Sequence, residues 1–241
     1  MKKALIIGGA NGIGLAIALQ LSDYDHVYII DKVAPNIAVL PAHISFEVFD
    51  LKSQDYSIFN RYQDISLLMI TAGFGRLAYF HDISEQHIID SFQVNTVAVI
   101  RIIKHFYNCL QGQNNFLCGV MVSIAGFMSS PLFATYGATK AALKVFIESV
   151  NVELEMGGSS NRILNVSPGS IKGTNFNGGE NDLSLITELA QQIIIHLEAK
   201  DDLFIPQYEE IYHEVLQRYH EDFRAEGRHS YEYKLQNGRM K

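Results

Sequence analysis

The sequence predicts an α/β fold in which helices cover both faces of one parallel, doubly wound sheet. Short apolar runs bounded by glycine, proline or polar residues alternate with longer segments of helical periodicity, the pattern of repeated β–α–β units. A length of 241 residues suits one domain that buries about 70–75% of the surface of its unfolded chain. The sequence contains no internal repeat, linker or low-complexity block. We therefore expect a single domain over residues 1–241.

The first β–α unit carries a glycine-rich turn. Residues 2–7 form a short apolar run typical of a buried strand, residues 15–21 have helical spacing, and Gly-Gly-Ala-Asn-Gly-Ile-Gly stands between them at 8–14. Glycines permit a tight turn and let backbone N–H groups approach a pyrophosphate, whose charge is favoured by a helix N-terminus. The next strand, 27–30, ends in Asp31, which is placed to accept from both ribose hydroxyls of an adenosine. The unit predicts a dinucleotide site.

The remaining elements follow in order. We expect strands at 44–49, 66–70, 119–123, 162–166 and 203–206, and helices at 53–62, 84–110, 136–156, 183–197 and from 208 onwards. Ser84 is the expected N-cap of the longest helical region. Residues 207–241 are expected as a C-terminal helical extension with an aromatic stripe that packs on its own domain or on a sister subunit. The polar end from Arg224 is open to disorder.

Composition excludes several classes of function. A net charge of −7 argues against nucleic acid or an anionic membrane surface as the main partner. The two lysines before the first apolar run could suggest a signal peptide, but glycines interrupt that run and no convincing cleavage site follows. Cys109 and Cys118 do not suggest a disulfide framework, and no uninterrupted apolar stretch reaches about twenty residues. We expect a cytoplasmic protein, and nine scattered histidines without ligand spacing predict no metal site.

Tyr136 and Lys140 are the strongest catalytic candidates. A spacing of four places the phenol and the ammonium on one face of the predicted helix. A phenol with a pKa of about 10 is a poor acid or base at neutral pH, and a fixed positive charge lowers that pKa. Ser123, thirteen residues before Tyr136, could hydrogen-bond the substrate oxygen that the phenol protonates. A surface Tyr and Lys on an ordinary helix would be the better interpretation of this spacing alone.

Taken together, these motifs resemble the short-chain dehydrogenase/reductase family, in its compact form of about 250 residues with a Rossmann-type sheet. The resemblance covers about residues 4–174 and rests on nine elements in order: the turn at 8–14, Asp31, Asp50-Leu51, Ala72-Gly73, Asn95, Ser123, Tyr136, Lys140 and Pro168-Gly169.

The resemblance implies a role for each catalytic candidate. Tyr136 would be the general acid in carbonyl reduction and the general base in alcohol oxidation, and Ser123 would orient the substrate oxygen. Lys140 would lower the pKa of the phenol and bind the nicotinamide ribose, and Asn95 would hold a water that links Lys140 to solvent. From the residues alone, Asn95 could instead bridge backbone groups, and Ser123 could be a turn former at the end of a strand.

The resemblance also implies a cofactor-binding set, which comprises Gly8, Asn11, Gly12, Ile13, Gly14, Asp31, Asp50, Leu51, Ala72, Gly73, Tyr136, Lys140, Pro168, Gly169, Ile171 and Thr174. Three departures from the family pattern affect this set. Ile7 replaces a threonine before the first glycine, Ile70-Thr71 replaces two asparagines, and Gly173 stands where a threonine is usual, with Thr174 one residue later.

Cofactor choice is predicted from charge. Asp31 disfavours a 2′-phosphate, and the turn at Ala10-Asn11 offers no basic residue to attract one. The positive charge of Lys32, directly after Asp31, could partly offset this repulsion of a 2′-phosphate. We expect NAD, with NADP the less favoured cofactor.

An apolar substrate pocket is expected beside the catalytic residues. Its predicted members are Ser123, Ala125, Phe127, Leu132, Phe133, Ser170 and Phe176, which suit a small hydrophobic or carrier-linked alcohol or ketone. The substrate-side loop, about 170–184, contains a short polar stretch with Asn177-Gly178-Gly179, and this favours an open pocket with a short flexible lid.

Two other functions share these motifs, and a homo-oligomer is expected. A non-catalytic NAD-binding redox sensor would bind without turnover, and an epimerase or dehydratase would convert substrate without net cofactor turnover. The resemblance implies a homodimer or homotetramer in which the two long helices pair with their symmetry mates. The apolar or small residues expected on those faces are Ile88, Phe92, Val99, Ile103 and Phe106 on the first helix and Ala138, Ala142, Val145, Ser149 and Val152 on the second.

Overall fold

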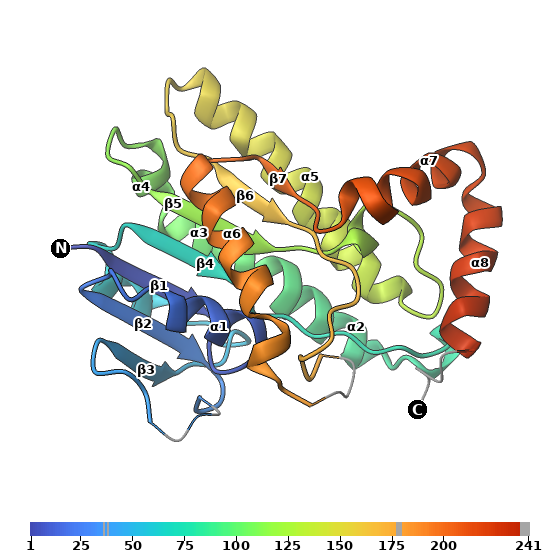
Figure 1. Cartoon of the computed structure of the whole chain (residues 1–241), viewed down its shortest axis with the longest axis horizontal. Coiled ribbons are helices and arrows are strands. Elements are labelled where there is room, and N and C mark those ends of the chain that lie inside the picture. Colours follow the sequence, from blue (N-terminus) through green and yellow to red (C-terminus); the bar gives the residue numbers. More distant parts are fainter. Residues whose placement is uncertain (36, 38, 177–179, 237–241) are drawn as a thin grey trace.

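Seven parallel strands form the centre of the molecule (Figure 1). The computed structural model describes residues 1–35, 37, 39–176 and 180–236. The strands are β1 (Lys3–Ile7), β2 (His26–Asp31), β3 (Ile44–Val48), β4 (Leu67–Ile70), β5 (Leu117–Met121), β6 (Ile163–Val166) and β7 (Leu203–Phe204). They lie in the order β3-β2-β1-β4-β5-β6-β7, and every neighbouring pair is parallel. The doubly wound, Rossmann-type sheet is confirmed.

Helices cover both faces of this sheet. The described helices are α1 (Gly12–Gln20), α2 (Glu85–Phe92), α3 (Ala98–His105), α4 (Tyr107–Gln111), α5 (Ala134–Met156), α6 (Thr187–Ala199), α7 (His213–Glu221) and α8 (Phe223–Gln236). Helices α1 and α6 pack on one face, and α3 and α5 pack on the other. None of the helices in the described part of the chain is both long and apolar enough to cross a membrane.

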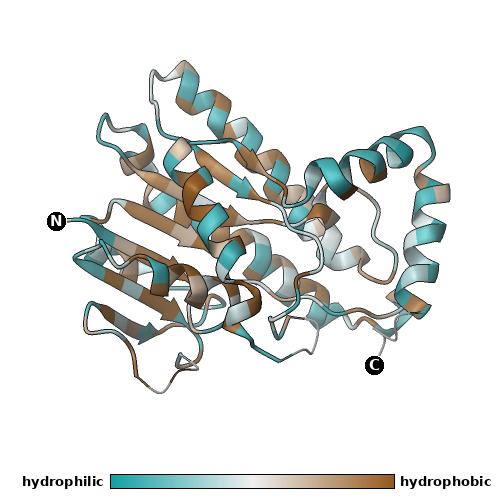
Figure 2. Cartoon of the chain, in the orientation of Figure 1, coloured by the Kyte–Doolittle hydropathy of each residue, from teal (hydrophilic) through white to brown (hydrophobic). Residues whose placement is uncertain are grey.

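The central strands are buried on both faces, as parallel strands between two helical layers must be. All four residues of β4 are buried, and Leu5 and Ile6 of β1 are fully buried. The edge strand β3 is largely exposed. Figure 2 shows the same contrast, because the central strands are mostly hydrophobic whereas the outer helices α7 and α8 are mostly hydrophilic. The hydrophobic sheet provides a rigid base for the loops at its carboxyl edge.

The long helical region that begins at Ser84 is not continuous. Ser84 caps α2 as predicted, because its side chain accepts from the backbone N–H of His87 at 3.2 Å. A π-helical turn, Gln93–Val97, then separates α2 from α3, and the chain leaves helical geometry again at Phe106. π-turns inside helices are frequent at functional sites.

Two expected elements differ from the structure. The helix predicted over 53–62 is only a 3₁₀ helix, Ser57–Tyr62, because the carboxylate of Asp55 binds the backbone N–H and hydroxyl of Ser57 and holds the preceding residues in a turn. Disorder from residue 224 onwards is wrong for 224–236, which belong to α8; residues 237–241 lie outside the described part. Tertiary contacts order this helix: Glu226, 8% exposed, binds Arg218 at 2.9 Å.

Candidate active site

The predicted site residues follow the carboxyl ends of the parallel strands. Gly8 comes after β1, Asp31 ends β2, Ala72 follows β4, Ser123 follows β5 and Pro168 follows β6. Strand β1 lies between β2 and β4, so the chain's crossovers run in opposite directions on its two sides. Open α/β sheets bind ligands at this kind of switch point.

The glycine-rich turn is shaped by close backbone contacts. Gly8 has a φ of +84°, and a Cβ there would stand 2.4 Å from the backbone nitrogen of Ala72. A Cβ on Gly14 would stand 2.4 Å from Oγ1 of Thr71. The Thr71 hydroxyl donates to the carbonyl oxygens of Ile7 at 3.1 Å and Gly8 at 2.9 Å. The Thr71 hydroxyl thus links the end of β4 to the glycine-rich turn. Ile7, which replaces a threonine of the family pattern, has no hydroxyl that could do so.

The N-terminus of α1 faces the loop that follows β6. Gly12 has a φ of +54°. A Cβ on Gly12 would lie 3.7 Å from the methyl carbon of Thr174. Asn11 caps α1 with extended backbone, but its side chain makes no capping hydrogen bond; Ile13 packs into the core beneath. Beside Gly12, the buried Oδ1 of Asn181 has no hydrogen-bond partner among the described residues. The backbone N–H groups of the first helical turn have no partner within a helix, so the N-terminus of α1 can donate to a pyrophosphate.

Asp31 is held at the edge of the same turn. Its carboxylate accepts from the backbone N–H of Ala10 at 3.1 Å and of Lys32 at 2.7 Å. Asp50 and Leu51 form the turn after β3: the Asp50 carboxylate accepts from a backbone N–H two residues later, and the Leu51 carbonyl accepts from a tyrosine hydroxyl. Asp31 therefore lies beside the glycine-rich turn at the end of β2, with its carboxylate bound to the backbone on both sides.

Ser123, Tyr136 and Lys140 converge at the end of β5. The Ser123 hydroxyl accepts from a nearby backbone N–H at 3.1 Å, and it lies 3.4 Å from the carbonyl oxygen of Pro168. Tyr136 and Lys140 lie one turn apart on α5, and the Lys140 Nζ is 5.6 Å from the centre of the Tyr136 ring. Nζ also donates to the carbonyl oxygen of Met121 at 2.8 Å. Only 8% of Tyr136 and 2% of Lys140 are exposed.

Burial changes the acidity of both groups. It raises the pKa of Tyr136 above the ordinary value of a phenol, although a hydrogen bond from Ser123 acts in the opposite direction. Burial also lowers the pKa of Lys140 to about 7. The expected lowering of the Tyr136 pKa by Lys140 is therefore not found in the protein alone: burial raises this pKa, and Ser123 is the group that acts in the opposite direction. Lys140 itself is poised to exchange a proton near neutral pH.

Asn95 lies in the π-turn and is fully buried. Its Oδ1 accepts from the backbone N–H of Phe74 at 3.0 Å, and its Nδ2 donates to the Phe74 carbonyl at 2.7 Å. A Cβ on Gly73 would lie 3.4 Å from both the Asn95 Oδ1 and the Lys140 Nζ. The side chain of Asn95 thus bridges backbone groups and fixes the loop after β4 beside Lys140.

The loop after β6 closes the cofactor side of the site. Gly173 has a φ of +80°, and a Cβ there would stand 2.6 Å from a backbone carbonyl, so a threonine would not fit. Thr174 is instead the residue that lies close to Gly12. This explains why the threonine of this loop stands at 174, one residue later than the family pattern places it. Ile171 packs partly into the core, and Ser170 is exposed. The Asn177-Gly178-Gly179 stretch of the expected lid lies outside the described residues.

Aromatic rings surround Tyr136 on the substrate side. The Phe133 ring stacks on Tyr136 with centroids 4.3 Å apart, and the Phe176 ring lies 5.2 Å from it. A Cβ on Gly75 would stand 2.6 Å from the Phe133 ring, so the loop after β4 closes tightly over these rings. Phe133 and Phe176 are therefore brought together with Tyr136, as expected for a hydrophobic pocket.

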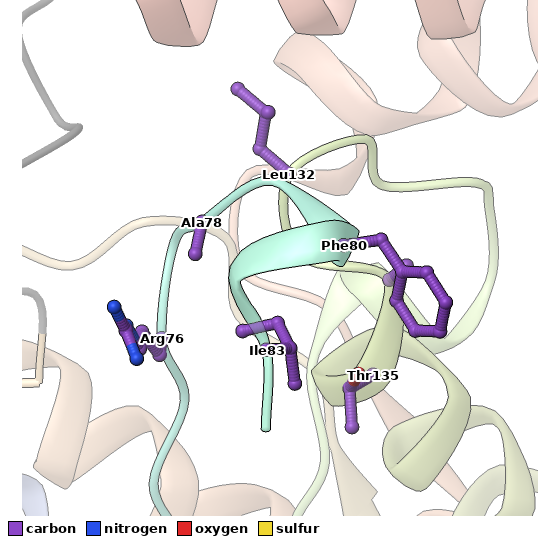
Figure 3. Close-up of a pocket in the computed structure, with 7 residues that line it drawn as sticks. Arg76, Ala78, Phe80, Ile83, Leu132 and Thr135 are labelled. Carbon is purple, nitrogen blue, oxygen red and sulfur yellow. The ribbon is translucent and has the colours of Figure 1, made fainter. Parts of the chain in front are cut away.

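The other pocket candidates are more dispersed. Ala125 is buried, and its carbonyl oxygen lies close to Gly137 of α5. The Phe127 ring lies 5.1 Å from Nζ of Lys144, which is one helical turn beyond Lys140. A small pocket of about 40 Å³ lies at the start of α5, and Figure 3 shows Arg76 on one side of it and Phe80 on the other. Its wall consists of Arg76, Ala78, Phe80, Ile83, Leu132, Ala134 and Thr135. Leu132 alone of these was predicted.

Sequence reasoning missed three residues at the site. Thr71 was noted only as a departure, Asn181 carried no pattern, and Tyr212 was assigned to an aromatic stripe. In the structure, a Cβ on Gly169 would lie 1.6 Å from the Tyr212 hydroxyl oxygen, so the C-terminal extension touches the Pro168-Gly169 segment. Only the glycine at 169 could have hinted at such a close approach.

The residues present fit a nicotinamide dinucleotide. The turn at 8–14 leaves room that side chains would fill, Asp31 lies beside that turn, and Tyr136 and Lys140 follow β5 at the same edge of the sheet. Among the described residues, no group of three or more histidines, cysteines or acids is placed so that it could hold a metal ion.

Comparisons with known proteins agree with this geometry. A sequence model for short chain dehydrogenases matches residues 2–183. An uncharacterised oxidoreductase of Saccharomyces cerevisiae is 28% identical over 72% of this chain and 56% of its own length. A very-long-chain 3-oxoacyl-CoA reductase of Phaeosphaeria nodorum is 25% identical over 63% of this chain and 50% of its own length. The chain thus spans about half the length of these curated relatives.

Solved structures share the fold. A short-chain dehydrogenase from Burkholderia cenocepacia, solved in complex with NADP, has a TM-score of 0.78 and 20% identity, and the match covers 95% of this chain and 99% of that one. One from Streptomyces avermitilis has a TM-score of 0.77 and 19% identity, with 98% of each chain covered. Because the family match extends over most of the sequence, the chain belongs to the short-chain dehydrogenase family of oxidoreductases.

Proposed function

We propose that the protein transfers a hydride between NAD(H) and an alcohol or ketone. The observation that carries this proposal is the convergence of Ser123, Tyr136 and Lys140 beside the glycine-rich turn. The nicotinamide, when bound, supplies or accepts the hydride. The protein has to place the substrate oxygen against a proton donor and exclude water from it.

Each catalytic side chain has a distinct task in this proposal. The Tyr136 phenol donates a proton to the carbonyl oxygen during reduction and removes it during oxidation, and the Ser123 hydroxyl hydrogen-bonds the same oxygen. Lys140, with a pKa of about 7, returns the proton to Tyr136. Asn95 acts as a positioning residue, because it fixes the backbone of Phe74 next to Lys140.

We propose NAD as the preferred cofactor. The Asp31 carboxylate at the end of β2 would repel a 2′-phosphate, which supports NAD. Solved structures of the same fold contain NADP or 5-hydroxy-NADP, so both dinucleotides must be compared. We expect kcat/KM to be at least several-fold higher with NADH than with NADPH, and Asp31→Ser to reduce this preference. A several-fold preference of the unaltered enzyme for NADPH would contradict the assignment.

We propose a hydrophobic ketone or alcohol, free or linked to a carrier, as the substrate. The rings of Phe133 and Phe176 against Tyr136 provide an apolar surface for it. A chain about a quarter identical to this one is a very-long-chain 3-oxoacyl-CoA reductase, which favours 3-oxoacyl compounds as the first substrates to test.

Replacement of Tyr136 tests the mechanism. Tyr136→Phe should lower kcat by a factor of about 10² or more while dinucleotide affinity stays nearly unchanged, because only the proton donor is removed. Absorbance of the reduced nicotinamide, followed against a panel of alcohols and ketones, measures the effect. Tyr24→Phe is the matched control, since Tyr24 is equally buried at 8% but lies in the core under α1. Undiminished turnover by Tyr136→Phe, or tight dinucleotide binding by the unaltered protein without any turnover, would contradict the proposal.

We propose that the protein assembles through the outer faces of α5 and the α2–α3 region. The α5 residues Ala138, Ala142, Val145, Ser149 and Val152 are all exposed, with Val145 at 59% and Val152 at 60%. On the face of the α2–α3 region, Phe92 is 36% exposed. Val99, Ile103 and Phe106 are buried in the core and cannot contact a partner subunit.

Sedimentation equilibrium at micromolar concentration should therefore detect a homodimer or homotetramer, which Val145→Asp with Val152→Asp dissociates. A fully active species of about 27 kDa would rule out obligatory assembly.

A further inference from the structure

A groove separates α8 from the segment that leads to the catalytic helix. We call it the α8 groove, and its lining residues are Ser129, Pro131, Phe223, Arg224, Gly227, Arg228, Tyr231 and Glu232. It has a volume of about 410 Å³. Figure 1 shows α8 at the margin of the molecule, beyond the N-terminal end of α5. The groove shares no lining residue with the small pocket at the start of α5.

Two arginines give one side of the groove a positive charge. Arg224 and Arg228 are four residues apart on α8, so they share a helix face. Both attract the carboxylate of Asp222 electrostatically, without a close ion pair to any described acid. Asp222 is a nearby acid, but its Oδ1 already accepts two backbone N–H groups at the start of α8, at 2.9 and 3.1 Å. Glu232 stands four residues after Arg228 and adds one negative charge to the same lining. Like charges at this spacing repel each other, and an anion between them would relieve the repulsion.

A buried hydroxyl lies on the floor of the groove. The Oγ of Ser129 is buried and has no hydrogen-bond partner within the described ranges. It faces Gly227, where a Cβ would stand 3.4 Å from it. Buried hydroxyls normally have a partner, and a ligand oxygen in the groove could provide one.

The remaining wall is apolar. Phe223, Pro131 and the ring of Tyr231 line it, and Phe223 is 49% exposed. The Arg224 guanidinium lies over the Phe223 ring, 4.6 Å from its centre. A ligand that combines anionic oxygens with an apolar or aromatic body would complement both walls.

The groove is connected to the catalytic site through one short segment. Pro131 lies two residues before Phe133, whose ring stacks on Tyr136. Nζ of Lys234 on α8 donates to the Ser130 hydroxyl at 2.7 Å and to the Pro131 carbonyl at 2.8 Å, which fixes the helix to this segment. A molecule bound in the groove would therefore lie against the chain that carries the substrate-side aromatic wall.

We propose that the α8 groove binds the phosphate-bearing end of a carrier-linked substrate whose carbonyl group reaches Tyr136. This inference rests on the proposed ketone reduction. The two arginines bind the phosphate oxygens, Ser129 donates a further hydrogen bond, and the apolar wall holds the rest of the carrier. The groove sets the affinity for the carrier and takes no part in the chemical step.

The double variant Arg224→Gln with Arg228→Gln tests the proposal. Free coenzyme A serves as the binding probe in calorimetry at low salt, and its affinity should fall by at least tenfold in the variant. With a 3-oxoacyl-CoA as substrate, KM should rise by about the same factor while kcat is unchanged. With a carrier-free 3-oxo ester, both KM and kcat should remain those of the unaltered enzyme.

The control variant is Arg61→Gln with Lys104→Gln, which changes the net charge equally but on residues away from the groove. It should leave coenzyme A affinity and KM unaltered. Failure of the unaltered protein to bind coenzyme A, or an equal loss in both double variants, would overturn the inference even if ketone reduction is observed. Absence of turnover with every ketone would overturn the proposed function, and calorimetry would still decide whether the groove binds the probe.

Discussion

Replacement of Thr71 by valine should weaken both the fold and the cofactor site. The Thr71 hydroxyl has one proton, shared between the carbonyl oxygens of Ile7 and Gly8. The Ile7 oxygen also accepts two backbone N–H groups, at 2.8 and 3.1 Å, so it keeps partners in the variant. The Gly8 oxygen accepts from no other group in the described part of the chain. Thr71→Val has nearly the same shape and therefore isolates the loss of this hydrogen bond.

The loss of stability expected for Thr71→Val follows from these hydrogen bonds. One lost hydrogen bond together with one carbonyl left without a partner corresponds to about 1–3 kcal/mol of unfolding free energy. For a chain of this size, each kcal/mol shifts Tm by roughly 2–4 °C. Because Thr71 also touches the Gly14 position, we expect dinucleotide affinity to fall as the turn loosens. Thr71→Ser keeps the hydroxyl and should retain most of both properties.

Urea unfolding followed by circular dichroism, with a fluorescence titration of NADH, measures the two effects. Ser91→Ala is the control, because it removes a hydroxyl that donates to a helical carbonyl at 2.7 Å on α2. This control should lower stability modestly and leave NADH affinity unchanged. If Thr71→Val is as stable as the unaltered protein within about 0.5 kcal/mol, the assigned role of the hydroxyl is wrong.

Two further predictions concern the glycine-rich turn and Lys140. Gly8→Ala should abolish NADH binding or folding, because the new Cβ would clash with the Ala72 backbone. Gly158 has a similar φ of +78° but no atom within 4 Å of such a Cβ, so Gly158→Ala should lower the free energy of unfolding by only about 1 kcal/mol. Chemical denaturation and NADH titration of both variants separate the steric clash from backbone strain, and equal effects would refute the clash. Burial lowers the pKa of Lys140 to about 7, so between pH 7 and 9.5 the unfolded chain binds more protons than the folded one, and stability should rise with pH relative to Lys140→Met. Parallel pH profiles of unfolding free energy for the two proteins would contradict this pKa.

Local patterns were enough to predict the fold class and most of the candidate site. Apolar runs of strand length and helical periodicity act over a few residues, so the sheet strands and the catalytic helix could be located from them. Ser123, Tyr136 and Lys140 lie close in sequence, and the order of the strands brings them to the edge where the glycine-rich turn lies. The function of the individual site residues stays a prediction, because it depends on substrate and cofactor.

Contacts between distant segments were decided only by the tertiary structure. The bond from Thr71 to the first turn, the approach of Tyr212 to Gly169 and the ordering of α8 against residues 129–131 each join positions more than forty residues apart. Such contacts leave no periodic signal, because each depends on one side chain meeting one backbone group after the sheet has formed. The sequence by itself determined where the strands form and in what order they follow along the chain. Packing at the carboxyl edge determined which side chains meet there, since burial and close approach exist only in the assembled domain.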